Sequence, residues 1–287
     1  ASNKVYDSNS SATVSVTLSG FVGSETLTYT NSSSFNNKNV GTGKTVTVDS
    51  ITLADGNNGG LASNYSITPG QTTTANITAK SLTISGIIAS SKTYNGSTSA
   101  TLDTSAILYS GFIPGDTFDG SYTGVFSNAN VGTAKTVTIT SSYTGADVSN
   151  YSITNQSSTT ADISAKALTA TASASNKTYD ATNSASVTLT LSGLVGSETL
   201  GSTNTSTFNN KNVGSNKTVT VNSITLANGS NGGLAANYSI SAGQTTTANI
   251  TAKALTVSGI TASNKTYDGS TNATLTGTAV YSGLVSG

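Results

Sequence analysis

The chain has 287 residues, and its composition excludes several classes of protein. Charged residues make up 8%, twelve lysines balance ten Asp and two Glu, and Cys, His, Met, Trp and Arg do not occur. A net charge of zero without basic clusters argues against binding to nucleic acid and against a polybasic hold on membranes. Without His or Cys the chain lacks the usual general base, the thiol nucleophile and most transition-metal ligands. We therefore expect no enzyme and no cofactor.

The distribution of apolar residues predicts a folded, all-β chain. Val, Ile, Leu, Thr, Tyr and Phe fall in alternating runs, which suit the pleated, half-buried surface of a strand. Only two prolines occur, whereas disordered chains are usually rich in Pro and carry a high net charge. No apolar run has the length of a membrane span, so we expect no membrane insertion.

A Lys-x-Tyr-Asp/Asn motif occurs four times, and its spacing shows that the chain is repetitive. The tyrosines are 88, 85 and 88 residues apart, and the four pairs are Tyr6-Asp7, Tyr94-Asn95, Tyr179-Asp180 and Tyr267-Asp268. Two further markers keep the same register: Asn-Tyr-Ser-Ile, which contains Tyr65, Tyr151 and Tyr238, and Ala-Lys-x-Leu-Thr, which begins at Ala79, Ala165 and Ala252. Recurrence at one fixed period indicates tandem domains.

The alternating spacing indicates two repeat types in the order A-B-A-B. Residues 1–87 align without a gap on residues 174–260, which points to duplication of a two-domain cassette. We place the boundaries at the Ala-Lys pair, between its two residues. The predicted domains are 1–79 (type A, lacking a first strand), 80–165 (type B), 166–252 (type A) and 253–287 (a partial type B). We expect the chain to be an excerpt of a longer array.

Within residues 166–252, period-two patterns predict six strands in chain order: Lys166–Thr171, Ala185–Leu191, Lys217–Val221, Ser223–Ala227, Tyr238–Ser241 and Thr246–Thr251. Clusters of Asn and Gly at residues 209–214 and 228–233 favour turns between them. Short strands separated by regular turns predict tandem small antiparallel β-sandwich (Ig-like) domains, forming an elongated rod. A parallel β-solenoid would need a shorter period inside each unit, and none is present.

The motif Lys265-Thr266-Tyr267-Asp268-Gly269, together with a downstream Asn-Tyr-Ser, resembles the YDG-type repeats. With their MBG-type relatives, these repeats occur in large bacterial exoproteins, often beside a filamentous-haemagglutinin secretion domain. The resemblance covers the whole chain, although Ser8 and Ala181 replace the motif's Gly in the type A units. It implies secretion to the surface of a Gram-negative bacterium and a stalk or adhesin role, with no catalytic residues to carry over.

The Tyr-Asx motif has a structural interpretation and a functional one. Structurally, the Tyr ring would cover one end of each domain, and the Asp or Asn would hydrogen-bond a turn. Functionally, the motif would form a shared ligand site at each domain junction. We favour the structural interpretation because the motif carries Asn95 where the type A units carry Asp.

Two other groups of residues are weak candidates for chemistry. Asp116 and Asp119 lie close together in sequence and could contribute oxygen ligands to calcium. Glu25 and Glu198 could act as the buried acid of a Lys–Asn isopeptide bond, although the type B units contain no Glu. Thr-x-Thr runs are typical of ice-binding faces, but single short rows favour ordinary strand surfaces.

Three functional hypotheses remain at this stage. The first is a structural rod or extracellular filament, whose partners are neighbouring repeats. The second is an adhesin module that binds a glycan, ice or a host protein through exposed aromatic residues, for which the candidates are Tyr29, Tyr109, Tyr122 and Tyr143. The third is self-association by strand addition at exposed sheet edges, favoured by the missing first strand of residues 1–79.

Overall fold

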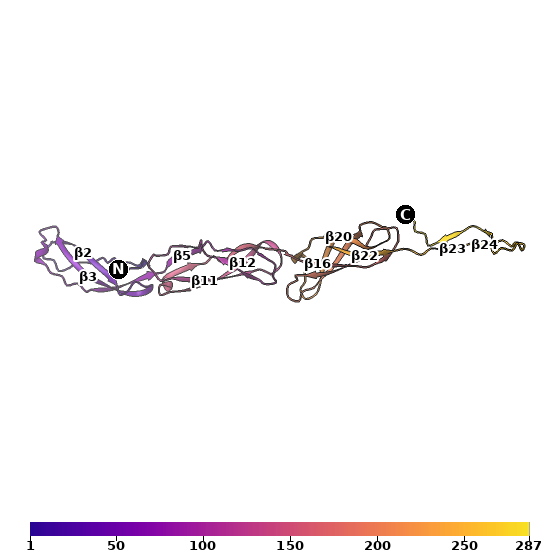
Figure 1. Ribbon diagram of the computed structural model, residues 1–287. Helices are drawn as coiled ribbons and strands as arrows, with labels where there is room; N and C mark the ends of the chain where they lie inside the picture. The colour runs from indigo at the N-terminus through magenta and orange to yellow at the C-terminus, as the bar shows by residue number, and fades with distance from the viewer. Residues whose placement is uncertain (287) are drawn as a thin grey trace. The chain divides into compact units, whose positions relative to one another are not determined.

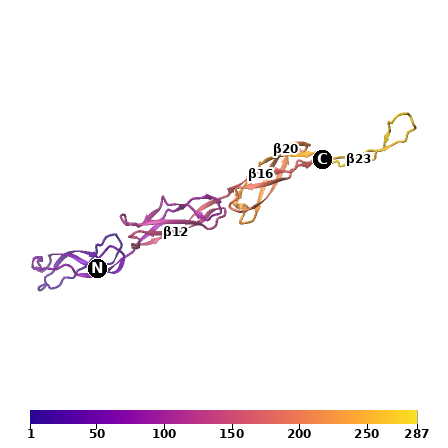
Figure 2. The ribbon, with the colours of Figure 1, turned by 60° about the horizontal axis from the view of Figure 1, so that its bottom comes forward.

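The computed structural model describes residues 1–286, and strands dominate it from end to end (Figures 1 and 2). The only helical elements in this range are three single 3₁₀ turns, namely η1 (Ala62–Asn64), η2 (Val148–Asn150) and η3 (Ala235–Asn237). The prediction of an all-β repeat fold is therefore confirmed. No helix among the described residues is long and apolar enough to cross a membrane.

The chain divides into two compact units, which are described separately below. The first comprises residues 1–91, 98–128 and 134–162, and the second comprises residues 92–97, 129–133 and 163–287.

Residues 1–79 form one four-stranded sheet. Its order is β1-β4-β3-β2, with bounds Lys4–Val5, Thr72–Thr78, Gly41–Asp55 and Leu27–Phe35. The strands alternate between exposed and buried side chains, so Val46, Val48 and Ile77 face the core and their neighbours face solvent. Residues 14–19 belong to no strand, although their sequence alternates in the same way.

Residues 80–165 form a three-stranded, a five-stranded and a two-stranded sheet. In the first, β5 (Lys80–Ser85) lies between β10 (Leu108–Ser110) and β13 (Tyr151–Thr154). The second has the order β7-β14-β12-β11-β8, with bounds Lys92–Thr93, Ser158–Ser164, Gly132–Thr144, Asp119–Phe126 and Ser99–Ala100. The third pairs β6 (Ile88–Ala89) with β9 (Leu102–Asp103). Leu82 and Ile84 of β5 are fully buried.

Residues 166–252 repeat this plan. The larger sheet has the order β17-β22-β20-β19, with bounds Lys177–Thr178, Thr245–Thr251, Gly214–Asn228 and Leu200–Phe208. Two smaller sheets pair β15 (Lys166–Ala167) with β21 (Tyr238–Ser239), and β16 (Thr169–Ala174) with β18 (Val187–Ser192). Phe208, Val219 and Ile250 of the larger sheet pack against Ala174 and Val187 of a smaller one. Both sheets therefore contribute to one core.

Residues 253–286 form two short antiparallel ladders, one nested inside the other. One pairs β23 (Thr256–Ser258) with β26 (Val280–Ser282), and the other pairs β24 (Thr261–Ala262) with β25 (Leu275–Thr276). Both ladders are exposed, and Figure 1 draws them at the yellow end of the colour scale.

The structure corrects the predicted strand list in three places. The predicted strand Lys166–Thr171 is divided at Leu168 into β15 and β16, which belong to two different sheets. Residues 217–221 and 223–227 are not separate strands, because β20 runs through both with Asn222 bulged out of the register. The long strand β19 was not predicted. Its sequence between Leu200 and Phe208 is almost entirely Gly, Ser, Thr and Asn, so it lacks an apolar alternation. It becomes a strand because β20 pairs with it along its whole length.

Pairing is mixed, whereas the sequence predicted an antiparallel arrangement. Most ladders are antiparallel, but each of the first three repeats also contains parallel pairs: β1 with β4, β5 with β13, β7 with β14, β15 with β21 and β17 with β22. In each case a short segment near the start of a repeat lies beside a strand near its end. Such pairs have no hairpin signal in the sequence.

Candidate functional site

The first site lies in the first unit, where Tyr6 meets residues of the following repeat. We call the group Tyr6, Asp116 and Tyr151 the first junction. The Tyr6 hydroxyl lies 3.1 Å from Asp116 Oδ1, and the Tyr151 hydroxyl donates to Oδ2 at 2.5 Å. The two rings meet edge to face, with centroids 5.7 Å apart and an interplanar angle of 77°. One carboxylate is thus held by a tyrosine from each of two repeats.

A buried amide reinforces the first junction. Asn150, from the Asn-Tyr-Ser-Ile marker, is 1% exposed. Its Oδ1 accepts a 2.9 Å hydrogen bond from the Val40 backbone N–H, and its Nδ2 donates to Asn39 Oδ1 at 3.3 Å. A buried amide that satisfies a backbone donor in this way costs free energy to expose or remove.

Lys38 adds positive charge to the first junction. Its Nζ lies 2.9 Å from Asp147 Oδ1 and 3.4 Å from Asp116 Oδ1. The hydrogen bond to Asp147 is the main reason that the pKa of Lys38 is raised. Burial alone would raise the pKa of Asp116, but hydrogen bonds from Tyr151, Ser8, Tyr6 and Lys38 outweigh it, so this pKa is lowered. The carboxylate is therefore held ionised.

The second unit contains an equivalent group, the second junction, formed by Tyr94, Glu198 and Tyr238. The Tyr94 hydroxyl donates to Glu198 Oε1 at 2.6 Å, and the Tyr238 hydroxyl donates to Oε2 at 2.6 Å. The rings are again edge to face, at 5.4 Å and 79°. Two junctions in one chain therefore share one arrangement of tyrosine, carboxylate and tyrosine.

The buried amide is repeated at the second junction as well. Asn237 is 1% exposed, accepts a 2.9 Å hydrogen bond from the Val131 N–H and donates to Asn130 Oδ1 at 3.0 Å. The Lys–Asp pair is not repeated, because Ala129 and Leu234 stand where the first junction has Lys38 and Asp147. Both junctions therefore have the tyrosine–carboxylate and asparagine hydrogen bonds, but only the first has the ion pairs of Lys38 with aspartates.

Burial also affects the tyrosines. It is the main cause that raises the pKa of Tyr94 to about 12, with the hydrogen bond to Glu198 adding to the effect. Burial and then the hydrogen bond to Asp116 raise the pKa of Tyr151 to about 12. Both hydroxyls therefore remain protonated donors at neutral pH, as the carboxylates require.

The Asx residues of the motif each close a tight turn. A side-chain oxygen of Asp7, Asn95, Asp180 or Asp268 accepts the backbone N–H two residues further on, at 2.9–3.2 Å. The three aspartates also pair with the motif lysines Lys4, Lys177 and Lys265, with Nζ–Oδ1 distances of 2.7–2.8 Å. The tyrosine of the motif directly precedes this turn.

The remaining tyrosines of the predicted set are not in complete junctions. Tyr65 donates a 2.5 Å hydrogen bond to Glu25 and packs against Phe21, which gives the receiving half of a junction only. Tyr179 is half-buried beside residues 252–255 and 283–285. Tyr267 is 93% exposed.

The structure gives the weak candidates other surroundings. Asp116 is saturated by protein donors, whereas Asp119 is exposed at the start of β11. No group of three or more Asp or Glu suited to a metal occurs within residues 1–286. Glu25 and Glu198, proposed as isopeptide acids, accept hydrogen bonds from tyrosine hydroxyls instead.

The four aromatic residues named for glycan binding are all half-buried. Tyr109, Tyr122 and Tyr143 pack with Phe118 in the core of the first unit. Tyr29 accepts the backbone N–H of Val16. Their rings are therefore not the open platforms that sugars usually stack on, and glycan binding stays a prediction.

Sequence reasoning identified the tyrosines and named Asp116 and Glu198 for other chemistry, but it did not predict that these residues would meet. Lys38, Asp147 and the amides of Asn150 and Asn237 were not predicted as parts of a site. The available signal was the nearly equal spacing between the Tyr-Asx motif and the Asn-Tyr-Ser-Ile marker of the following repeat, which is 145 residues from Tyr6 to Tyr151 and 144 residues from Tyr94 to Tyr238.

Comparison with known proteins gives one result. The family model described as YDG domain matches the chain four times, over residues 1–75, 78–161, 164–248 and 251–287. No curated protein and no solved structure matches the chain.

Proposed function

The chain belongs to the YDG domain family, and from this membership and the two junctions we propose that it is a structural repeat region of a secreted bacterial surface protein. In this role the repeats act as a stalk or as part of an extracellular fibre. No catalytic role is proposed.

The repeated junction is the observation that supports this role. At each junction, two tyrosines from adjoining repeats hydrogen-bond one carboxylate, and a buried asparagine of the later repeat accepts a backbone N–H of the earlier one. Each hydrogen bond to a carboxylate contributes about 1.5–3 kcal/mol to stability. A junction residue whose partner repeat is absent does not make this contribution. Each repeat is thus stabilised by its neighbour, as in other arrays in which successive repeats contact one another.

The surface composition also favours a spacer over an adhesive surface. The exposed positions of the long strands are mainly Thr, Ser and Asn, as in β20, and the net charge is zero. These groups are well hydrated and carry little long-range attraction for charged partners.

Antibodies raised against the chain test the proposed location. On intact cells that produce the parent protein, we expect labelling of the outer surface without permeabilisation. Labelling that requires permeabilisation would overturn the proposal that the chain is secreted.

Single-molecule pulling tests the structural role. We expect the chain to resist force through the junctions, and a chain carrying both Tyr6→Phe and Tyr94→Phe to extend at lower force. The matched control is Tyr267→Phe, since Tyr267 is exposed. Equal force for the double variant and the wild-type chain would show that the junctions carry no load.

A further inference from the structure

The two junctions have the same plan but different side chains. At each one, the earlier repeat supplies what we call the leading side: the motif tyrosine, the residue two positions after it and a loop that ends in a hydrogen-bonded Val. The later repeat supplies the receiving side, which comprises the carboxylate, the second tyrosine and the buried Asn. The leading sides comprise Tyr6, Ser8 and residues 36–40 at the first junction, and Tyr94, Gly96 and residues 127–131 at the second. A type A leading side thus meets a type B receiving side at the first junction, and the types are reversed at the second.

The type B receiving side, in residues 80–165, holds two buried carboxylates. Asp116 is 9% exposed and Asp147 is 7% exposed. A backbone hydrogen bond from Thr117 and the hydrogen bond from Lys38 lower the pKa of Asp147 and outweigh the opposing effects of burial and of the nearby Asp116 charge. Lys38, from the leading side, forms ion pairs with both carboxylates. Two buried like charges without a cation would be costly, so this receiving side requires the lysine of a type A repeat.

Ser8 is the second distinguishing feature of the type A leading side. It has φ +63°, a left-handed conformation that is costly for residues other than Gly. Its hydroxyl donates to Asp116 Oδ1 at 2.7 Å and accepts from Lys38 Nζ at 3.3 Å. Ser8 therefore links the lysine to the buried carboxylate, which a glycine at this position could not do.

The type A receiving side, in residues 166–252, is apolar at a matching position. Leu234 stands where the type B receiving side has Asp147. The leading side that meets it carries Ala129 in place of Lys38. A lysine in this leading side would find a leucine at the position where the first junction offers an aspartate.

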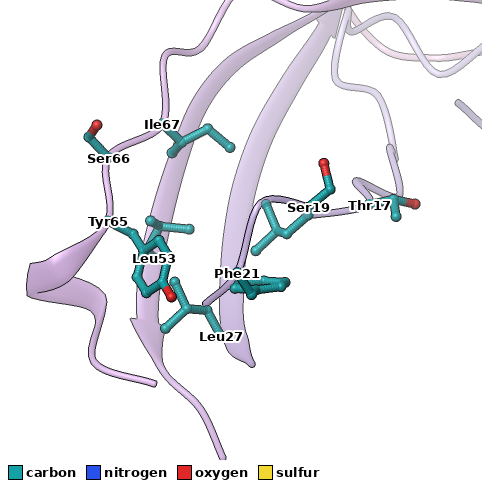
Figure 3. A pocket seen from close by; sticks show the side chains of 9 residues that line it. Thr17, Ser19, Phe21, Leu27, Leu53, Tyr65, Ser66 and Ile67 are labelled. Carbon is teal, nitrogen blue, oxygen red and sulfur yellow. The ribbon is translucent and has the colours of Figure 1, made fainter. Parts of the chain in front are cut away.

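The first repeat, which is also of type A, has the same apolar character around its own receiving tyrosine. Tyr65 packs edge to face on Phe21, with ring centroids 5.8 Å apart. Figure 3 shows both side chains beside Leu27. Leu61 again stands at the position of Asp147. Both type A receiving sides therefore combine one carboxylate with apolar neighbours, whereas the type B receiving side has two carboxylates.

Gly96 fits the type A receiving side because it has no Cβ. Its φ is +76°, and a Cβ added to it would lie 3.0 Å from Val195 Cγ1, which is closer than ordinary contact between carbon atoms. Ser8 and Ala181 occupy the equivalent position in the type A repeats with φ +63° and +67°, and both carry a Cβ. A type A leading side placed on a type A receiving side would therefore press a Cβ against this valine.

We propose that each receiving side accepts the leading side of the other repeat type and disfavours that of its own type, so that the junctions fix the order A-B-A-B. Lys38 and Ser8 select at the first junction, and Gly96 with Val195 selects at the second. Such selectivity combines a favourable match with an unfavourable mismatch. The partner of each of these surfaces is an adjoining repeat of opposite type. The biological meaning of this order rests on the structural role proposed above.

Two backbone amides report the opening of the junctions in the full chain. The Val40 N–H donates to Asn150 and the Val131 N–H donates to Asn237, each at 2.9 Å and each across one junction. Their rates of hydrogen exchange, measured by nuclear magnetic resonance, follow local opening. Val40 and Val131 belong to different compact units, so each amide is the internal control for the other.

The first test gives the first junction a type B residue. Lys38→Ala should make the Val40 N–H exchange about tenfold faster, because two buried carboxylates lose their cation, and should leave the Val131 N–H unchanged. Asp147→Asn is the matched second change. In the wild-type chain it should accelerate exchange, whereas in the Lys38→Ala chain it should slow exchange by removing an uncompensated charge. Equal acceleration in both backgrounds would overturn the selectivity of this junction.

The second test gives the second junction a type A residue. Gly96→Ala adds the Cβ that Ala181 carries, and its backbone strain is the same whatever residue lies opposite. The acceleration of Val131 N–H exchange should be about threefold or more larger in the wild-type background than in a Val195→Ala background, where Cγ1 is absent. The Val40 N–H should not change. Equal acceleration in the two backgrounds would overturn the selectivity here.

Tyr94→Phe separates this proposal from the structural role. It removes a hydrogen bond that does not depend on repeat type, so it should accelerate Val131 N–H exchange in any case. An effect of Tyr94→Phe without the background dependence described above would refute the selectivity and leave the structural role intact. No effect of Tyr94→Phe would show that the junction does not couple the repeats, and the structural role would then lose its support.

Discussion

Tyr94 and Glu198, which are 104 residues apart in the chain, are joined by a 2.6 Å hydrogen bond. The other oxygen of the same carboxylate accepts from Tyr238, which also packs edge to face on Tyr94. A motif tyrosine, which we call the plug, therefore packs against the following repeat. There it contacts the tyrosine of the Asn-Tyr-Ser-Ile marker and the carboxylate, which together we call the socket.

Removal of the plug hydroxyl should weaken the second unit. Tyr94→Phe deletes one partly buried hydrogen bond to a carboxylate and keeps the ring, so we expect a loss of about 1.5–3 kcal/mol in the free energy of unfolding. Urea unfolding followed by circular dichroism measures it. Tyr267→Phe is the control and should change nothing, because Tyr267 is 93% exposed. An equal effect of both substitutions would contradict the plug.

The first junction should loosen in acid. The pKa of Asp116 and that of Asp147 are lowered in the folded state from the ordinary value of 3.8. The stability that these carboxylates contribute is therefore fully present above about pH 4 and is lost as the pH falls through the lowered pKa values. Urea midpoints measured from pH 5 down to pH 2 should show this loss.

Asp116→Asn is the matched variant for the acid experiment. It should be less stable than the wild-type chain at pH 5 and should approach it at the lowest pH, where the wild-type carboxyl is protonated too. Parallel pH curves for the two chains would show that Asp116 does not contribute through its charge.

Both junctions should also loosen in alkali. The pKa of Tyr94 and that of Tyr151 are raised to about 12, from an ordinary value of 10.0. The stability that they contribute is present below pH 10 and is lost as the pH rises from 10 to 12. Phenolate absorbance followed during an alkaline titration should show these two groups ionising late. In Tyr94→Phe and Tyr151→Phe chains the late phase should shrink, and an unchanged late phase would assign it to other tyrosines.

Two glycines at equivalent turns should respond differently to alanine. Gly20 and Gly111 both have positive φ, so alanine costs about 1–2 kcal/mol at either position. At Gly111 the new Cβ would also meet the Ser81 carbonyl oxygen at 2.3 Å, and relieving this overlap should cost about 1–3 kcal/mol more. Chemical unfolding of the two variants compares them. Equal losses would mean that β5 does not pass as close to Gly111 as the structure shows.

The sequence predicted the β fold and the repeat register because both rest on local patterns. Val219 and Val221, and Ala248 and Ile250, alternate with polar residues and face the core as expected. The strand β19 escaped prediction because its inward positions between Leu200 and Phe208 are Ser202, Asn204 and Ser206, whose burial depends on a partner that local sequence does not reveal. The same holds for the short parallel strands, which pair with segments about 70 residues away.

The candidate site was predicted only in part, for a related reason. The four Tyr-Asx motifs are visible as repeats, and their Asx turns are local. The partners of Tyr6, however, are Asp116 and Tyr151 from another repeat, and no propensity links residues so far apart. Asp116 was consequently named as a candidate calcium ligand from its residue type and sequence neighbours alone. In the structure its oxygens accept hydrogen bonds from tyrosine and serine hydroxyls and contact Lys38.

The parallel pairs at the edge of each repeat bear on the order of folding. Lys4 pairs with Ile77 and Lys177 with Ile250, so the strand beside the plug tyrosine is held by a strand 73 residues later. Contacts so distant in sequence form slowly, because the intervening chain must first be ordered. A repeat that becomes free to fold gradually, from either end, therefore cannot form this strand pair until almost all of its residues are present. In residues 80–165, the tyrosine that enters the following repeat (Tyr94) and the residues that receive the tyrosine of the preceding repeat (Asp116 and Tyr151) then become available together, so completion of one repeat prepares the junctions on both of its sides.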